Sequence, residues 1–128
     1  LSADEVFLVV SPEPTSIVYA YAVVKVVGEI DPGKPFSVVA NFVSGEAEAA
    51  EIFLKLSRAT QKFLGKSLDY LGAVQRDPSV TEAVRSQCPV LEYQPQCPAS
   101  HDFVKLARTL QNRLYQRTDK NAEVAGRT

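Results

Sequence analysis

The chain has 128 residues, of which 45% are hydrophobic and 23% charged, the balance of a folded globular protein and not of a disordered one. Lysine and arginine (14) nearly match aspartate and glutamate (15), so the net charge of −1 gives no reason to expect nucleic acid as a partner. No apolar run approaches the roughly 20 residues of a membrane span. Methionine is absent throughout, and we expect the chain to be a fragment, one half of a larger fold.

Three apolar segments predict β-strands. Residues 6–10 and 36–43 are continuous runs rich in β-branched side chains, which is typical of strands covered on both faces. A shorter run at 68–74 predicts a third strand. Helical patterns lie between these strands, and that alternation predicts an α/β fold with a parallel sheet and right-handed βαβ crossovers.

The first helix is expected to follow the polar corner at residues 12–16. Its two prolines should keep the corner out of the helix, with Thr15 or Ser16 as the cap and Glu13 facing outward. The corner has two interpretations that composition leaves open: a structural turn, or a carboxylate that contacts a lysine of another subunit. The helix has one apolar face made of Ile17, Ala20, Tyr21, Val24 and Val27, and a second one opposite made of Val18, Tyr19, Ala22 and Val26. A helix that is apolar nearly all round is expected to be covered on both sides.

The second helix is predicted to follow Ser44 and to end at Gly65, a residue suited to a helix C-terminus. Its expected buried stripe is Ala49, Phe53, Leu56, Thr60 and Phe63. A short third helix is indicated by Asp77-Pro78 and by a capping box at residues 79–82.

The last helix is predicted from about Ser100 to Arg117, followed at 118–128 by a polar tail that we expect to be disordered. Its expected apolar face is Phe103, Leu106, Ala107, Leu110 and Leu114. From residue 105 onward the chain has six basic and two acidic residues, which give this segment a net charge of +4. This helix could therefore bind an anionic surface, although a solvated basic face explains the same pattern.

Polar side chains follow the predicted strands at the edge where a parallel sheet binds its ligands. Asn41 ends the second strand and could pair with the edge of a purine base, or only with nearby backbone. Arg76 and Asp77 follow the third strand and could serve the same site, or be a solvated charge and a helix cap.

Neither a catalytic nor a metal site is expected within this chain. Cys88, Cys97 and His101 lack the close pairing of a structural zinc site, and two cysteines without a disulfide pattern suit a reducing cytoplasm. The phosphate-binding pattern G-x-x-x-x-G-K-[ST] is absent, and so is G-x-G-x-x-G. The single histidine makes a hydrolytic triad improbable.

Four segments nonetheless resemble a known family: residues 3–25 ("ADEVFLVVSPEPTSIVYAYAVVK"), 38–43 ("VVANFV"), 63–90 ("FLGKSLDYLGAVQRDPSVTEAVRSQCPV") and 98–110 ("PASHDFVKLARTL"). They resemble the C-terminal half of the MinD/ParA-type P-loop ATPases, in particular the flagellar-number regulators called FlhG or FleN. The resemblance implies that residues 1–117 are the C-terminal part of a nucleotide-binding domain with a deviant Walker fold.

The resemblance also implies a function. These proteins bind ATP with Mg²⁺, dimerise, and act with flagellar or cell-division machinery in the cytoplasm. Their phosphate loop and Mg²⁺ carboxylates lie in the half that this chain lacks, so the full-length protein is expected to be an ATPase and this chain alone to be inactive. No nucleic-acid partner is expected. The amphipathic membrane-targeting helix typical of the group is missing here, which leaves membrane association open.

The resemblance assigns individual residues as well. Asn41 matches the adenine-recognising asparagine, and the loop Gln75, Arg76, Asp77 and Pro78 matches the segment that packs along the base. Glu13 and Thr15, with Ser16 and Tyr19 beside them, match the dimer face. Two positions depart from the family: Tyr19 stands where aspartate is usual, and Gln75 where proline is common. The alternative function is a protein-interaction module that does not hydrolyse ATP.

Overall fold

The computed structural model describes residues 4–126, and it contains one parallel sheet in the order β1-β2-β3. The strands are β1 (Val6–Val10), β2 (Phe36–Val43) and β3 (Asp69–Gln75). The predicted α/β class and parallel sheet are therefore confirmed. The first two strands have the predicted bounds, and the third is shifted by one residue.

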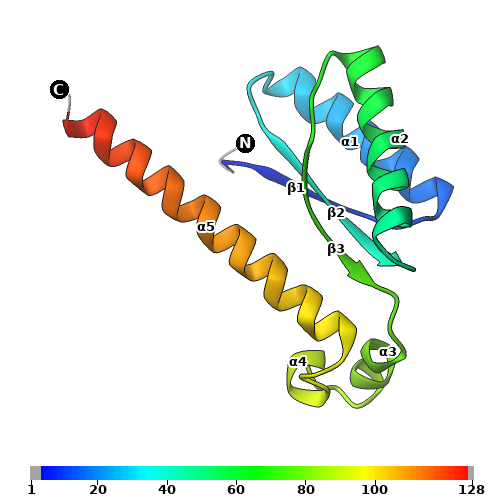
Figure 1. The fold of residues 1–128 in the computed structure, drawn as a ribbon. Helices are drawn as coiled ribbons and strands as arrows, with labels where there is room; N and C mark the ends of the chain where they lie inside the picture. The colour runs from blue at the N-terminus through cyan, green and yellow to red at the C-terminus, as the bar shows by residue number, and fades with distance from the viewer. Residues whose placement is uncertain (1–3, 127–128) are drawn as a thin grey trace.

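Helices cover the two faces of the sheet unequally (Figure 1). The helices that follow β1 and β2 lie side by side on one face; they are α1 (Pro14–Ile30) and α2 (Glu46–Leu64). The chain beyond β3 forms two short helices and then one long helix across the other face: α3 (Pro78–Arg85), α4 (Val90–Tyr93) and α5 (Pro98–Gly126). The main core lies under α1 and α2, and a smaller cluster around Val74, Cys97 and Ala99 lies under α5. None of the described helices is both long and apolar enough to cross a membrane.

The start of α1 differs from the prediction. Pro14 is the first residue of the helix, because that position needs no backbone N–H and suits the fixed φ of proline. Glu13 is the N-cap and is extended, with no side-chain cap. Thr15 and Ser16 lie inside the helix, so their predicted capping role is wrong. The hydroxyl of Ser16 instead accepts a hydrogen bond from the backbone N–H of Ser11 at 3.0 Å, which closes the corner.

The two faces of α1 are as predicted. Ala20 and Val24 are buried against the sheet, and Ile17, Tyr21 and Val27 pack around them. On the opposite side Val18, Tyr19 and Val26 are 62%, 71% and 54% exposed.

Four of the five residues predicted for the α2 stripe are confirmed: Ala49, Leu56 and Thr60 are buried, and Phe53 packs partly buried against the core. The fully buried stripe also includes Ile52. It runs through Ala49, Ile52, Leu56 and Thr60, and the next step of four residues reaches Leu64. The predicted Phe63 therefore points away from the sheet and is 67% exposed. Gly65 ends the helix as predicted, in the left-handed conformation (φ 64°) that glycine adopts without strain.

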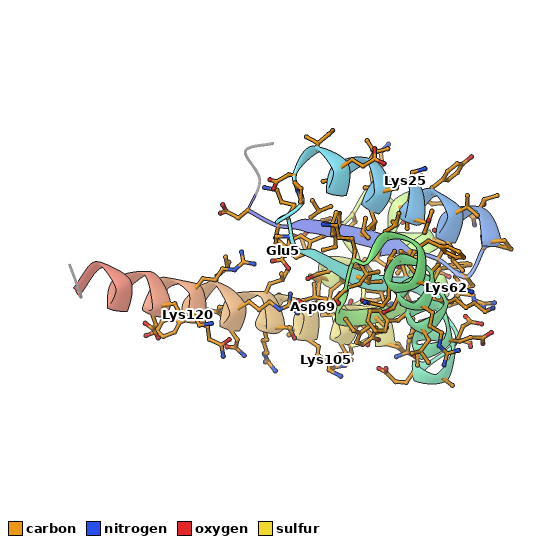
Figure 2. All side chains as sticks on the ribbon, turned by 90° about the horizontal axis from the view of Figure 1, so that it is seen from above. Glu5, Lys25, Lys62, Asp69, Lys105 and Lys120 are labelled. Carbon is orange, nitrogen blue, oxygen red and sulfur yellow. The ribbon has the colours of Figure 1, made fainter. Side chains whose placement is uncertain are left out.

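The long helix α5 continues to Gly126, past the predicted end at Arg117. Figure 2 shows Lys120 on a part of α5 that projects beyond the sheet. Where the helix crosses β3, Gly72 allows close approach, because a Cβ there would lie 2.7 Å from a terminal carbon of Leu106. The face turned inward combines Leu106 and Leu110 with polar side chains, whereas the predicted Phe103, Ala107 and Leu114 are exposed.

Candidate functional site

The carboxyl ends of β2 and β3 lie at one edge of the sheet, which we call the rim. The structure brings the predicted base-site residues together there: Asn41 near the end of β2, and Gln75, Arg76, Asp77 and Pro78 at the end of β3 and the start of α3. The backbone N–H of Arg76 donates to the carbonyl of Val43 at 2.8 Å, which ties the two strand ends together. Asn41 is exposed at this edge.

A β-bulge shapes the end of β2. Asn41 pairs with Val74 and Val43 with Gln75, so Phe42 is an extra residue with no partner in β3. Its φ of 61° is left-handed, which is rare for a large non-glycine residue. The bulge turns Val43 to the same buried face as Ala40, and it leaves both Asn41 and Phe42 exposed at the rim.

Phe42 was missed by sequence reasoning, which treated the whole run as one buried strand. Its ring is 53% exposed, and the guanidinium carbon of Arg76 lies 5.2 Å from the ring centroid. That distance is typical of a cation–π contact. The rim therefore carries an amide, an aromatic ring and a flat cationic group on neighbouring positions.

Asp77 caps α3, and both of its carboxylate oxygens are engaged. Oδ1 accepts from the backbone N–H of Ser79 at 2.9 Å, and Oδ2 from that of Ala99 at 3.0 Å. These hydrogen bonds, the one from Ala99 first, lower the pKa of Asp77 below its usual value of 3.8. The helix-cap interpretation of Asp77 is thus correct, whereas the predicted capping box at 79–82 is wrong, because Ser79 is inside the helix and Asp77 satisfies its N–H.

Gln75 at the end of β3 is bound by a side chain of α5. Its backbone N–H donates to Oδ2 of Asp102 at 2.9 Å, a contact across 27 residues that no sequence pattern indicates. Partial burial, and after it the carboxylates of Glu46 and Asp102, raise the pKa of Tyr70 above its usual value of 10.0.

The four predicted dimer-face residues line one groove of ≈ 580 Å³ between β1 and α1. Glu13, Thr15 and Ser16 form its polar end, and Tyr19 extends it along α1. The side of β1 away from β2 has no strand neighbour in the described part of the chain, so its backbone edge is open along this groove. Edges of this kind readily pair with another strand.

A cluster of charges joins the two ends of the chain. Glu5 accepts from Arg113 Nη1 at 3.0 Å and from Arg117 Nη2 at 2.6 Å. Ser37 donates to the same carboxylate and accepts from Arg113 at 2.7 Å. Two of the basic residues that suggested an anion-binding helix therefore share one carboxylate of the protein itself, which balances one of their two positive charges.

Groups of three or more potential metal ligands do not occur among residues 4–126. Cys97 is buried and its Sγ lies 3.2 Å from the hydroxyl of Ser100, while Cys88 lies 3.5 Å from the carbonyl of Pro89. Both cysteines are free thiols.

No model of a protein family matches the chain. Among curated proteins it is similar to the "Antiactivator FleN" of Pseudomonas aeruginosa, with 39% identity over 107 residues. That match covers 84% of this chain but 38% of FleN, so the chain spans roughly two fifths of the length of this relative.

Proposed function

Because this chain is a relative of the antiactivator FleN and resembles the FlhG/FleN group of MinD/ParA-type ATPases, we propose that it is part of a regulator of flagellar number or placement. In this proposal the chain supplies the half of the nucleotide-binding domain that recognises adenine and forms the dimer face. The protein acts in the cytoplasm as a homodimer, together with flagellar machinery.

The observation that carries the proposal is the arrangement at the rim. Parallel sheets bind their ligands beyond the carboxyl ends of the strands, and there the exposed Asn41 lies next to the loop from Gln75 to Pro78. An asparagine amide presents a donor NH₂ group and an acceptor oxygen side by side, which matches the acceptor and donor on the edge of adenine. Asp77 binds α3 and α5, so its contribution is to hold the loop in shape.

ATP needs more than this chain provides. The loop that holds the phosphates and the carboxylates that hold Mg²⁺ would come from a part of the protein outside these 128 residues. Positioned phosphates and Mg²⁺ supply most of the catalysis in phosphoryl transfer. Hydrolysis is therefore proposed for the longer protein, and this chain alone should be inactive.

The groove between β1 and α1 supports the dimer-face part of the proposal. It brings the Glu13 carboxylate and an open strand edge together with Tyr19, one residue of the exposed apolar face of α1. The same groove favours the alternative function, a protein-interaction module that does not hydrolyse ATP, because binding there would need no nucleotide.

Substitution of Asn41 tests the adenine-binding part of the proposal. In the complete polypeptide that the gene encodes, Asn41→Ala should weaken ATP binding by about 1–3 kcal/mol, the range for a lost polar contact that leaves its partners unpaired. Isothermal titration with ATP measures this loss, and Asn112→Ala, at an exposed position of α5, is the matched control. Unchanged ATP affinity together with a lower melting temperature would mean that Asn41 has only a structural role.

A further inference from the structure

Phe42 occupies a position that core packing does not explain. The residue at the bulge has a positive φ, and Val43 after it returns to the buried face; glycine would adopt this φ without strain. A phenylalanine at φ 61° is strained, and only about half of the residue is buried in return, since Phe42 is 53% exposed. Strained backbone of this kind is concentrated at functional sites.

The contact that the ring does make is with Arg76. The guanidinium carbon lies 5.2 Å from the ring centroid, while the backbone of Arg76 is anchored to the carbonyl of Val43. The contact with the Phe42 ring and the backbone hydrogen bond to Val43 thus hold Arg76 at the rim, where the exposed Asn41 also lies. A guanidinium is flat, and it stacks on aromatic rings and on nucleic-acid bases.

We propose that Phe42 is a positioning residue for purine binding. It holds the flat Arg76 guanidinium in place near Asn41, so that the ring of the base stacks on Arg76 while the edge of the base pairs with Asn41. This inference rests on the proposed function and adds to it a source of affinity that depends on the base and not on the phosphates.

The chain offers a matched control for the pair. Phe63 on α2 is also an exposed phenylalanine, at 67%, and the ammonium of Lys62 lies 5.2 Å from its ring centroid. It lies near the end of α2, away from the carboxyl ends of the strands. Phe63→Ala therefore removes an exposed ring with its own cation–π contact, but at a place where no base is expected.

The test compares two probes, ATP and inorganic tripolyphosphate, by calorimetric titration of the complete polypeptide that the gene encodes. Phe42→Ala should weaken ATP binding roughly 5- to 30-fold and leave tripolyphosphate binding within about 2-fold. Phe42→Tyr should retain the affinity for ATP. In an Arg76→Ala background, Phe42→Ala should have no further effect, because Phe42 acts through Arg76. Phe63→Ala should change neither affinity.

Phe42→Gly removes the same ring while relieving the strained φ, and it replaces the alanine variant if that variant does not fold. The inference is wrong if Phe42→Ala or Phe42→Gly weakens both probes equally, if either leaves ATP binding unchanged, or if the losses at Phe42 and Arg76 add. Should Asn41→Ala weaken ATP binding while the Phe42 variants do not, only this inference fails. Should the wild type bind no ATP, the proposed function fails with it.

Discussion

Asp77 shows how one side chain joins two parts of the fold. Its two oxygens accept the N–H groups of Ser79 and Ala99, so the starts of α3 and α5 are held by a single carboxylate. An ionised carboxylate is the best acceptor for such N–H groups, which is why its pKa is lowered. Asp77 therefore fixes the conformation of the loop at the candidate base site.

Replacing Asp77 by asparagine should lower the free energy of unfolding at neutral pH by about 1–2 kcal/mol. The amide keeps one acceptor oxygen and places an NH₂ group against the second N–H. Thermal unfolding followed by circular dichroism measures the loss. An unchanged melting temperature would contradict the capping role.

The pKa of Asp77 also predicts a dependence on pH. Since the folded pKa is lower than the unfolded value near 3.8, the stabilisation is fully present well above that value and is lost as pH falls through it toward the folded pKa. The melting temperature of the wild type should therefore fall further between about pH 6 and about pH 3 than the melting temperature of Asp77→Asn does. Equal losses in both proteins would show that other carboxylates carry the acid sensitivity.

The position of α5 depends on polar contacts with residues that are far away in the chain. Its N-terminal part packs on β3 where Gly72 meets Leu106, and farther along Arg113 and Arg117 bind Glu5 beside β1. The side chain of Glu5 is only 6% exposed, whereas those of the two arginines are 28% and 43% exposed. A carboxylate that is nearly buried depends on its partners, because it has lost its water.

Arg113→Ala should therefore destabilise the protein by about 1–3 kcal/mol, since it leaves Glu5 and Ser37 without a shared partner. Backbone amides near residue 113 should exchange with deuterium faster, while those of α2 should not change. Arg108→Ala, at an exposed position of the same helix, is the control and should have little effect. An equally small effect of Arg113→Ala would mean that packing at Gly72 suffices to hold α5.

Over the whole molecule, apolar surface is left uncovered around β1 and α1. Phe7 and Val9 are 47% and 64% exposed on the face of β1 that α1 does not cover, and Val18, Tyr19 and Val26 are exposed on the outer side of α1. Parallel sheets are normally covered on both faces, and monomers seldom expose large apolar patches. This surface needs a cover, either from a longer protein or from another copy of the chain.

The isolated chain should therefore self-associate, and the double substitution Tyr19→Ser with Val26→Ser should shift it toward monomer without unfolding it. Sedimentation velocity at several concentrations measures the shift, and circular dichroism checks the fold. The matched control replaces Phe63 and Val84, which are similarly exposed on α2 and α3, and should leave the association unchanged. A folded wild-type monomer at high concentration would show that the outer face of α1 is stable in water.

Much of the fold is predictable from local sequence pattern. The predicted bounds are found for the strands at 6–10 and 36–43, and α2 ends as predicted at Gly65. The buried and exposed faces of α1 are also the predicted ones. Each depends on the periodicity of apolar residues or on the backbone freedom of glycine, properties that a short segment carries by itself. The gathering of Asn41 and Arg76 at one rim also follows, because strands that are parallel end at the same edge.

Only the tertiary structure decided which side chains act together. The bulge at Phe42 exists because the pairing of β3 with β2 leaves Phe42 without a partner residue. The sequence "VVANFV" alone does not indicate how the two strands pair. The contact of Glu5 with Arg113 joins residues 108 positions apart, and Asp77 caps α3 while also binding α5. Such contacts depend on how the strands and helices pack in three dimensions, and the periodicity of a single segment carries no information about that packing.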